Sequence, residues 1–574
     1  MLRTRFGIDA ARYQRLTGIL TMGWSIKAFT AVICDTFAFL GYTKRWYMFV
    51  SCVVGSVFAL FYGLLPAKPS SGNIAAAFVF LSSYGKANVD VLSEGYYSRL
   101  MRKIPKAGPA LVSWIWWFII LGALLASVLQ GPLSDLNMPQ VGVFISAGLQ
   151  FLTSLIYLFN LYGEKTNRDE RIEDARIMHK ALLLELQKGK ALSRTEGREG
   201  SLDVDQGKAL QLEPIDDGET VALADDLPLN FTHTNQQQAQ KPMELGGGYQ
   251  DDASPEFLLP QPIIGCCGLI EINKEVVMRN KRIVAYSAVM TAAVITMTFG
   301  NILANTLGLL IICVVVSLVC SVMSFWALPL IIAKANVMAY LNMMLYIQLP
   351  GLLDSFYLAK EDCLPDGPHF SNTFYNTIAV GIIGNLAGLV GITAFRYIFL
   401  RCSYRLSLVV TTLLWMSASI FDIIMLKRWN IKIGIPDHAM YVCGDAIIGQ
   451  MCYMLSWMPM TILLSRLCPR GSESTVYALL AGFSNLGQAT STSIGAILME
   501  YVWPIKSNPP CDFTNAVKLV IVGHILLPLL IIPLTLLLPN VRVSDDIDID
   551  GNVISKTTQE EPHVKPGKDS NKAH

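Results

Sequence analysis

Long apolar stretches separated by short polar breaks dominate this chain. A helix needs about 20 apolar residues to cross a hydrocarbon core roughly 30 Å thick, and thirteen stretches come close to this length. They cover residues 16–38, 46–65, 73–94, 109–131, 139–162, 283–301, 306–331, 335–358, 374–398, 407–427, 438–465, 475–500 and 515–538. The pattern therefore predicts an all-α polytopic membrane protein with thirteen membrane-spanning helices.

A long polar segment at 163–282 separates the first five predicted spans from the last eight. Its first part alternates charges with an apolar stripe of helical period, so we expect it to extend the span at 139–162 as an amphipathic helix. From about residue 190 to 260 the composition is typical of a disordered linker, and a second polar segment at 541–574 predicts a disordered tail. Two membrane bundles joined by such a loop are the usual plan of transporters with two six-span halves.

The distribution of lysine and arginine predicts the orientation. With the first span running inward, the short inner loops hold eleven of these residues and the short outer loops hold six. This places the 163–282 segment and the tail in the cytosol and the N-terminus outside.

The composition narrows the class of protein further. Hydrophobic residues make up 52% of the 574 residues and charged residues 16%, with a mean hydropathy of +0.44. The net charge of +1 gives no reason to expect nucleic acid as a partner. The twelve cysteines and seven histidines show no metal- or haem-binding spacing, so we expect neither a metal nor a cofactor and no enzyme activity. No Walker-type phosphate loop is present, so any transport is secondary.

Charged residues inside predicted spans are the strongest candidates for function, because a charge at membrane depth persists only inside a bundle or along a water-filled path. Lys86, Asp90 and Glu94 follow one another at four-residue steps in the span at 73–94 and share one helical stripe. They favour a role in handling substrate or protons, while a self-neutralised Lys86–Asp90 ion pair is the structural alternative.

Other carboxylates in the spans extend this set of substrate- or proton-binding candidates to Asp354, Asp422 and Asp445. Titration of these groups and of Asp90 would couple protons to transport, and a facilitated carrier is the alternative. Asp35, Arg396 and Glu500 lie near predicted span ends, where an interfacial residue is the favoured interpretation.

The loop after the first span has a recognisable pattern. Asp35, Gly41, Lys44 and Arg45 make it similar to a loop of the major facilitator superfamily. In that superfamily the carboxylate and the basic residues clamp the inner ends of neighbouring helices in one transport state. The resemblance implies a two-bundle fold of the major facilitator type.

Longer strings resemble one family within that superfamily. They are "GIPDHAMYVCGDAI" at 434–447, "WMPMTILLSRLCPRGSESTVYALLAGFSNLG" at 457–487, "DCLPDGPHF" at 362–370 and the "GYTKRWYMF" loop. Together they are similar to folate–biopterin transporters, most of all to the trypanosomatid branch. The string around Arg466, Pro469, Gly471 and Glu473, with Asn485 following, is the most specific part, and we expect these residues to serve conformational change.

The resemblance also implies an organisation. "FGIDAARYQRL" is similar to the loop after the family's first span, so the resemblance implies that this chain begins after it. The expected units are a five-span N-terminal bundle and a linker, an extra transmembrane pair, a C-terminal six-span bundle and a tail. They cover residues 1–162, 163–282, 283–331, 332–540 and 541–574, respectively.

Family membership implies a small-molecule substrate, namely folate, biopterin or another pteridine, or S-adenosylmethionine, carried across a lipid bilayer, in our expectation the plasma membrane. A non-transporting nutrient sensor is a further alternative. Asp90 and Glu94 have counterparts in the family, but Lys86 has none. Lys86 and Arg396 are candidate cations for the glutamate tail of folate.

Two outer loops contain the only cysteines predicted to lie outside, Cys363 and Cys511. A disulfide between them is allowed in an oxidising exterior, and two unpaired thiols are the alternative.

Overall fold

The computed structural model describes residues 5–103, 108–173, 176, 262–265, 268–399, 401–466, 473–509 and 511–543. Eleven helical stretches of this part have the length and apolar composition to cross a membrane. They are Ala10–Thr36, Arg45–Leu64, Phe118–Asp135, Pro139–Leu158, Lys281–Leu303, Thr306–Ala327, Leu330–Tyr357, Thr373–Phe399, Tyr404–Leu426, Asp437–Leu464 and Ala516–Leu537. The chain is therefore an integral multi-pass membrane protein. Helices α5 and α21 are also long but more polar, and the count of thirteen spans stays a prediction.

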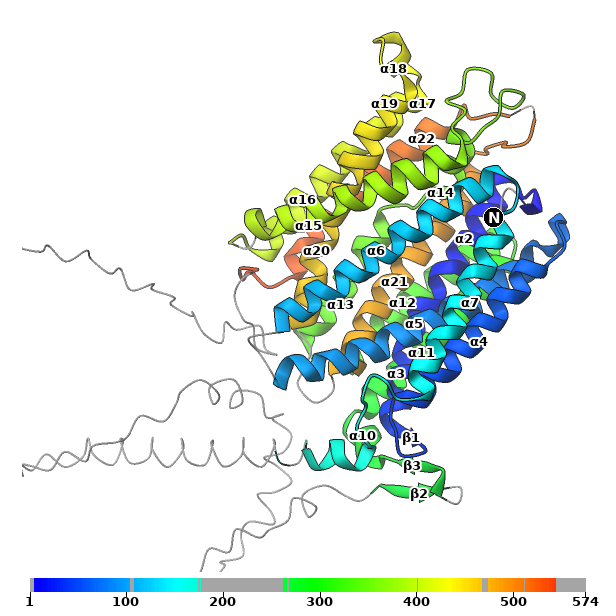
Figure 1. Ribbon diagram of the computed structural model, residues 1–574. Helices are drawn as coiled ribbons and strands as arrows, with labels where there is room; N and C mark the ends of the chain where they lie inside the picture. Colours follow the sequence, from blue (N-terminus) through cyan, green and yellow to red (C-terminus); the bar gives the residue numbers. More distant parts are fainter. Residues whose placement is uncertain are drawn as a thin grey trace, which may run out of the picture.

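The elements before the linker run side by side in alternating directions (Figure 1). They are α2 (Ala10–Ser25), α3 (Lys27–Thr36), β1 (Phe37–Phe39), α4 (Arg45–Leu64), η1 (Pro69–Ser71), α5 (Gly72–Lys103), α6 (Gly108–Asp135) and α7 (Pro139–Leu158). Helix α4 packs against both α5 and α7, and α2 packs against α5.

The elements that follow complete the bundle. They are β2 (Ile263–Gly265), β3 (Ile270–Ile272), α10 (Lys274–Arg279), α11 (Lys281–Leu303), α12 (Thr306–Ala327), α13 (Leu330–Leu345), α14 (Pro350–Tyr357), η5 (Thr373–Gly384), α15 (Asn385–Phe399), α16 (Tyr404–Ala418), α17 (Ile420–Leu426), α18 (Trp429–Lys432), α19 (Asp437–Tyr441), η6 (Val442–Gly449), α20 (Gln450–Arg466), α21 (Glu473–Ile497), η7 (Leu498–Val502), α22 (Ala516–Val520), η8 (Ile521–Leu526), η9 (Pro528–Leu530), α23 (Ile531–Leu534) and η10 (Thr535–Leu537). The segments η5, η6, η7 and η8 are π-helical, with wider turns than an α-helix.

Contacts between early and late helices hold the two parts of the chain together. Helix α2 packs along α21 and also against α14, and α6 packs against η5. Helix α11 packs against α2 and α12, whereas α12 packs against α13 and α21. The pair α11–α12 therefore contacts helices from both parts. The division into five units stays a prediction.

Two names distinguish the ends of the bundle. The linker end carries the loop at 37–44 and the strands β1, β2 and β3, and the disulfide end is the opposite one (Figure 1). There Cys363 and Cys511 form a disulfide, with their Cα atoms 5.1 Å apart. The sequence had left this pairing open.

The expected helical extension of the span at 139–162 is wrong. Helix α7 ends at Leu158, and Asn160 and Gly163 adopt positive φ angles of 51° and 75°. The Asn160 amide accepts from the Glu164 backbone N–H and donates to its carbonyl, at 3.0 and 3.1 Å, and this stabilises the turn. A helical segment starts again only at residue 167. The expected disordered stretch at 190–260 and the tail from residue 544 onward lie outside the described residues.

A three-stranded sheet at the linker end was not expected from the sequence. Strand β3 lies between β1 and β2, both antiparallel to it. The loop after the first span is thereby paired with the last residues of the linker. Such short strands give a weak sequence signal, because a three-residue apolar run is equally compatible with a helix end.

The stretch expected as one span at 335–358 is broken into α13 and α14. Pro350 begins α14, and residues 346–349 between the two helices are not helical. Backbone groups freed by such a break need partners inside a membrane. Gln14 of α2 supplies two of them, since its side chain donates to the Gln348 carbonyl at 2.5 Å and accepts from the Gly351 N–H at 2.6 Å.

Close approach of α13 and α21 requires a glycine. A Cβ atom added at Gly487 would lie 2.4 Å from the Tyr340 carbonyl oxygen, too close for any other residue. The Tyr340 ring stacks on Phe483 of α21, with centroids 4.4 Å apart, in the largest apolar core. This core fixes α21 against the helices on which the candidate residues lie.

Candidate functional site

The acidic ladder of α5 meets a lysine from another helix. Lys27, at the start of α3, is buried, and its ammonium lies 3.9 Å from Asp90 and 4.0 Å from Glu94. The rings of Trp24 and Tyr477 flank it at 6.0 and 5.9 Å. Asp90 therefore has a buried cation beside it while one-third of its side chain (34%) remains exposed.

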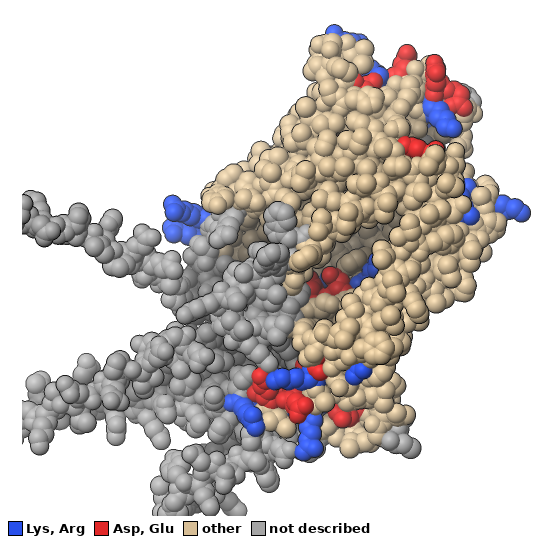
Figure 2. Space-filling view, viewed as in Figure 1, with Lys and Arg blue, Asp and Glu red and all other residues tan. Residues whose placement is uncertain are grey.

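Lys86 is placed differently from the expected ion pair. Its side chain is exposed, and it forms no ion pair with another residue of the part described. The direct Lys86–Asp90 pair is therefore not found, because Lys27 takes its place. Figure 2 shows a hollow in the middle of one face, with acidic and basic side chains inside it. The surface immediately around this hollow shows neither acidic nor basic side chains.

A second group of candidates comes together near the disulfide end. Asp354 of α14 accepts hydrogen bonds from the hydroxyls of Tyr13 and Tyr375, at 3.0 and 2.8 Å. Tyr13 belongs to α2 and Tyr375 to η5, so this carboxylate connects early and late helices. Its neighbour on the same helix, Tyr357, contacts the Tyr375 ring at 5.8 Å between centroids.

Asp422 and Asp445 meet at one hydroxyl. Tyr357 Oη lies 2.9 Å from Asp422 Oδ1 and 3.1 Å from Asp445 Oδ2. His524 of η8 lies on the other side of Asp422, with 3.8 Å between Nδ1 and Oδ2. The fold thus brings three predicted carboxylates into one polar cluster, although they lie far apart in the sequence.

The loop residues expected to clamp helices have defined partners. Asp35 accepts from the Thr475 hydroxyl of α21 at 2.8 Å, a contact between early and late helices at the linker end. The Arg45 guanidinium donates to the carbonyls of Tyr157 and Leu158 at 3.0 and 2.6 Å, which caps the C-terminus of α7. Gly41 has a φ of 77°, in the region that favours glycine.

Glu164 organises this loop and was not among the predicted residues. Its buried carboxylate accepts from the backbone N–H groups of Lys44 and Arg45, at 2.9 and 2.8 Å, where α4 begins. It also accepts from Tyr162, whose pKa is raised by burial and by the Glu164 charge, so that the phenol keeps its proton. Lys44 is buried, and its ammonium lies 3.4 Å from the Thr43 hydroxyl.

Replacing Glu164 by glutamine is expected to lower the free energy of unfolding by about 1–3 kcal/mol, because charge-assisted hydrogen bonds at the start of α4 are weakened. The thermal midpoint of the detergent-purified protein measures the effect. Glu361→Gln, an exposed glutamate in the loop at 359–372, serves as control. Equal midpoints for both variants would contradict this role of Glu164.

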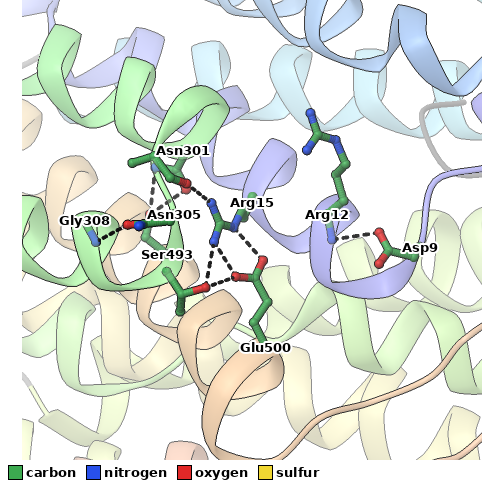
Figure 3. A network of polar contacts seen from close by, with 10 residues as sticks. Asp9, Arg12, Arg15, Asn301, Asn305, Gly308, Ser493 and Glu500 are labelled. Atoms are coloured by element: carbon green, nitrogen blue, oxygen red, sulfur yellow. Dashed lines mark hydrogen bonds and ion pairs between the residues drawn. The ribbon is translucent and has the colours of Figure 1, made fainter.

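Glu500 was expected to be an interfacial residue because it lies near a predicted span end, but the structure shows a different role. Its carboxylate forms an ion pair with the buried guanidinium of Arg15, which also donates to the Ala304 carbonyl at 2.7 Å. Thr306 donates to Glu500 at 2.8 Å. Figure 3 shows this pair beside Asn301 and Ser493, which hydrogen-bond to each other at 3.0 Å. The pair joins α2 to η7 and to the α11–α12 connection.

The structure describes only part of the most family-specific string, at 457–487. Asn485 of α21 donates to the Trp24 carbonyl at 3.5 Å, a further link between α21 and α2. Arg466 ends α20 and Glu473 begins α21. Pro469 and Gly471, together with the side chains of Arg396, Arg466 and Glu473, lie outside the part described.

Sequence reasoning missed three contributors to these sites, namely Arg15, Glu164 and His524. Lys27 was visible as a charge within the first span, but its partner was not. Arg15 precedes the predicted start of that span, and Glu164 lies in the polar segment, where charged residues are common. Only the fold shows that each lies against a functional candidate.

The fold resembles that of a solved transporter. The crystal structure of an auto-inhibited POT family peptide transporter superposes with a TM-score of 0.53, covering 95% of this chain and 92% of that one at 10% sequence identity. This likeness concerns the fold alone. It supports the expected helical transporter fold of the major facilitator type.

Curated relatives match a shorter stretch. Probable folate-biopterin transporter 2 of Arabidopsis thaliana is 32% identical over 166 residues, which is 29% of this chain and 32% of that protein. The folate-biopterin transporter of Synechocystis sp. is 29% identical over 152 residues (26% and 30%). Folate transporter 2 of Plasmodium falciparum is 28% identical over 168 residues (29% and 35%). The matched stretch thus spans about a third of each relative's length.

The family comparison covers far more of the chain. The profile of the BT1 family matches residues 1–558, which includes every helix described above. The strings that resembled folate–biopterin transporters lie within this range. The chain belongs to the BT1 family.

Proposed function

We propose that this protein is a secondary carrier that moves folate or a related pteridine across a membrane by alternating access. The observation that carries the proposal is Asp90, a partly exposed carboxylate held beside buried Lys27 within the helical bundle. Membership of the BT1 family and the names of the curated relatives support the substrate class. Those names also point away from an enzyme.

The chemistry of the substrate fits this site. A pterin edge presents an amino group and a ring N–H side by side, and one carboxylate accepts from both. Asp90 has exposed oxygen for such a contact, and the Lys27 ammonium lies 3.9 Å from it. The exposed ammonium of Lys86 lies one helical turn away and suits the carboxylates of a folate glutamate tail.

The contacts between early and late helices support alternating access. Tyr13–Asp354, Gln14–Gly351 and Arg15–Glu500 all lie towards the disulfide end. Asp135 at the end of α6 likewise accepts from the backbone N–H groups of Asn372 and Thr373, at 2.9 and 2.8 Å. These contacts would close the bundle at this end and would have to break for it to open.

Lys86 also separates the candidate substrates. S-adenosylmethionine is a cation and would be repelled by an exposed lysine, whereas folate is an anion and would be attracted. This favours folate and biopterin over the cationic alternative. We place the carrier in the plasma membrane, with the linker in the cytosol.

Uptake by cells that lack their own pteridine transport tests the proposal. Cells expressing the chain would receive labelled folic acid, biopterin or S-adenosylmethionine. We expect accumulation of folic acid and biopterin, and Lys86→Gln is expected to reduce folic acid uptake while biopterin uptake persists. Exclusive uptake of S-adenosylmethionine would support the alternative, a carrier of that cation. No uptake of any of the three by protein present at the cell surface would overturn the carrier and favour a sensor.

A further inference from the structure

In the polar cluster around Tyr357, one hydroxyl group faces two carboxyl groups, so there are fewer hydrogen-bond donors than acceptors. Tyr357 has one hydroxyl proton and therefore donates to Asp422 or to Asp445, but not to both. The carboxyl group that does not accept this proton still lies within hydrogen-bond distance of the phenol oxygen, so it must itself donate to that oxygen. One of the two carboxyl groups must therefore hold a proton, because an ionised carboxylate cannot donate. The arrangement of the Tyr357 hydroxyl and the two carboxyl groups therefore requires one bound proton.

His524 extends this cluster in a defined tautomer. Its Nε2 lies 2.9 Å from the Ile347 carbonyl oxygen, which only accepts, so Nε2 carries a hydrogen. Nδ1 has no hydrogen-bond partner among the described residues, and only 3% of the residue is exposed. This nitrogen points at Asp422, 3.8 Å away. A second proton has one place to bind, between Nδ1 and the Asp422 carboxylate.

The surroundings of the cluster supply no competing cation. No lysine or arginine of the part described forms an ion pair with Asp422 or Asp445. The titratable groups around it are Asp354 and Tyr357 of α14, Tyr375 of η5, Tyr441 of α19, Cys452 of α20 and Tyr346 before α14. Ser419 completes the lining, bonded to Tyr346 at 2.8 Å. Histidine is thus the basic group within reach of these carboxyls.

The backbone around the cluster is unusual as well. Tyr375, Asp445 and His524 come from three π-helical segments, η5, η6 and η8. Such wide turns are costly and occur often at functional sites. They aim side chains from three separate helical stretches at one point near the disulfide end.

We propose that Asp422, Asp445 and His524 form the proton-binding site that couples a proton gradient to transport. This inference rests on the proposed function and names the coupling ion and its ligands. The proton binds from one side of the membrane, is shared by the two carboxyls and His524, and leaves to the other side without any covalent change. Tyr357 acts as a positioning residue, since its hydroxyl turns to whichever carboxyl is ionised.

The site is connected to the contact between early and late helices. Tyr357 and Asp354 lie on the same short helix α14, and Asp354 accepts from Tyr13 of α2. His524 holds the Ile347 carbonyl in the break directly before α14. A proton that rearranges the bonds of Tyr357 and His524 therefore acts on both ends of α14. This helix would transmit the proton's arrival to the closed disulfide end.

Full-length protein in liposomes tests the assignment. Wild type, Asp445→Asn and His524→Gln would be compared in two assays: accumulation of labelled substrate driven by a pH gradient, and exchange of labelled for unlabelled substrate without a gradient. We expect both variants to lose gradient-driven accumulation and to retain exchange, which shows that they are folded. His438→Gln, an exposed histidine on α19, is the matched control and should behave like wild type.

An internal pH dye gives a second readout that needs no variant. Substrate entering wild-type vesicles is expected to bring protons with it. Substrate entry without proton movement overturns the proton site and leaves the carrier standing, as does normal gradient-driven accumulation by both variants. A wild type that neither accumulates nor exchanges any pteridine overturns the proposed function instead.

Discussion

Replacing Asp90 by asparagine is expected to reduce uptake of labelled folic acid and biopterin by about 100-fold, with the amount of protein at the cell surface unchanged. The neutral amide offers one acceptor oxygen where a carboxylate offers two, so the paired N–H groups of a pterin lose a charge-assisted contact. Such contacts contribute about 1.5–3 kcal/mol, and 1.36 kcal/mol corresponds to a factor of ten. Asp90 would therefore be the main contact of the carrier with the pterin edge.

Two comparisons separate this role from a structural one. Asp366→Asn, an exposed aspartate in the loop at the disulfide end, should leave uptake unchanged. Asp90→Glu keeps the charge beside Lys27 and should retain a measurable fraction of uptake. If Asp90→Asn instead lowered the amount of protein, the ion pair with Lys27 would be the main role of this carboxylate.

Replacing Glu500 by glutamine is expected to lower the free energy of unfolding by about 3–5 kcal/mol, because it leaves the buried Arg15 without its counterion. The thermal midpoint of the purified protein should fall accordingly. The double variant Arg15→Leu, Glu500→Leu removes both charges and should recover part of the loss. A double variant no more stable than Glu500→Gln would contradict an uncompensated charge as the cause.

The same variant bears on transport. The Arg15–Glu500 pair holds α2 against η7 and the α11–α12 connection at the disulfide end, so its loss should favour opening there. Labelling of a cysteine placed at Ser507, whose hydroxyl accepts from the Ala10 N–H at 2.8 Å, should become faster in Glu500→Gln. Unchanged labelling would show that this pair stabilises the fold but does not control opening at the disulfide end.

The sequence was sufficient to predict a multi-pass helical membrane protein and to single out charged residues within its spans as candidates. Apolar length identifies spans one at a time, and a charge within a span stands out without knowledge of its neighbours. Asp90 and Glu94 could be found in this way, as could Asp422 and Asp445. Their partners could not, because Lys27 and His524 reach them only through the packing of helices far apart in the chain.

Local backbone chemistry explains the other differences. Pro350 is visible in the sequence, but whether it bends or breaks a helix depends on partners for the freed backbone groups, and Gln14 supplies these from α2. The turn after Leu158 depends on Asn160 and Gly163 together. The π-helical segments follow from how side chains pack between helices, which no periodicity in a single segment records.

The small sheet at the linker end has a consequence for the long polar connection. Asn167 donates to Glu271 at 2.5 Å, and Arg171 donates to Asn273 at 2.7 Å, so both ends of this connection are fixed beside each other and beside β1. Loop-closure entropy changes by only about 0.6 kcal/mol for each doubling of length. The length of the connection between these anchors can therefore change during evolution without displacing the helices. The anchoring residues themselves cannot change in this way.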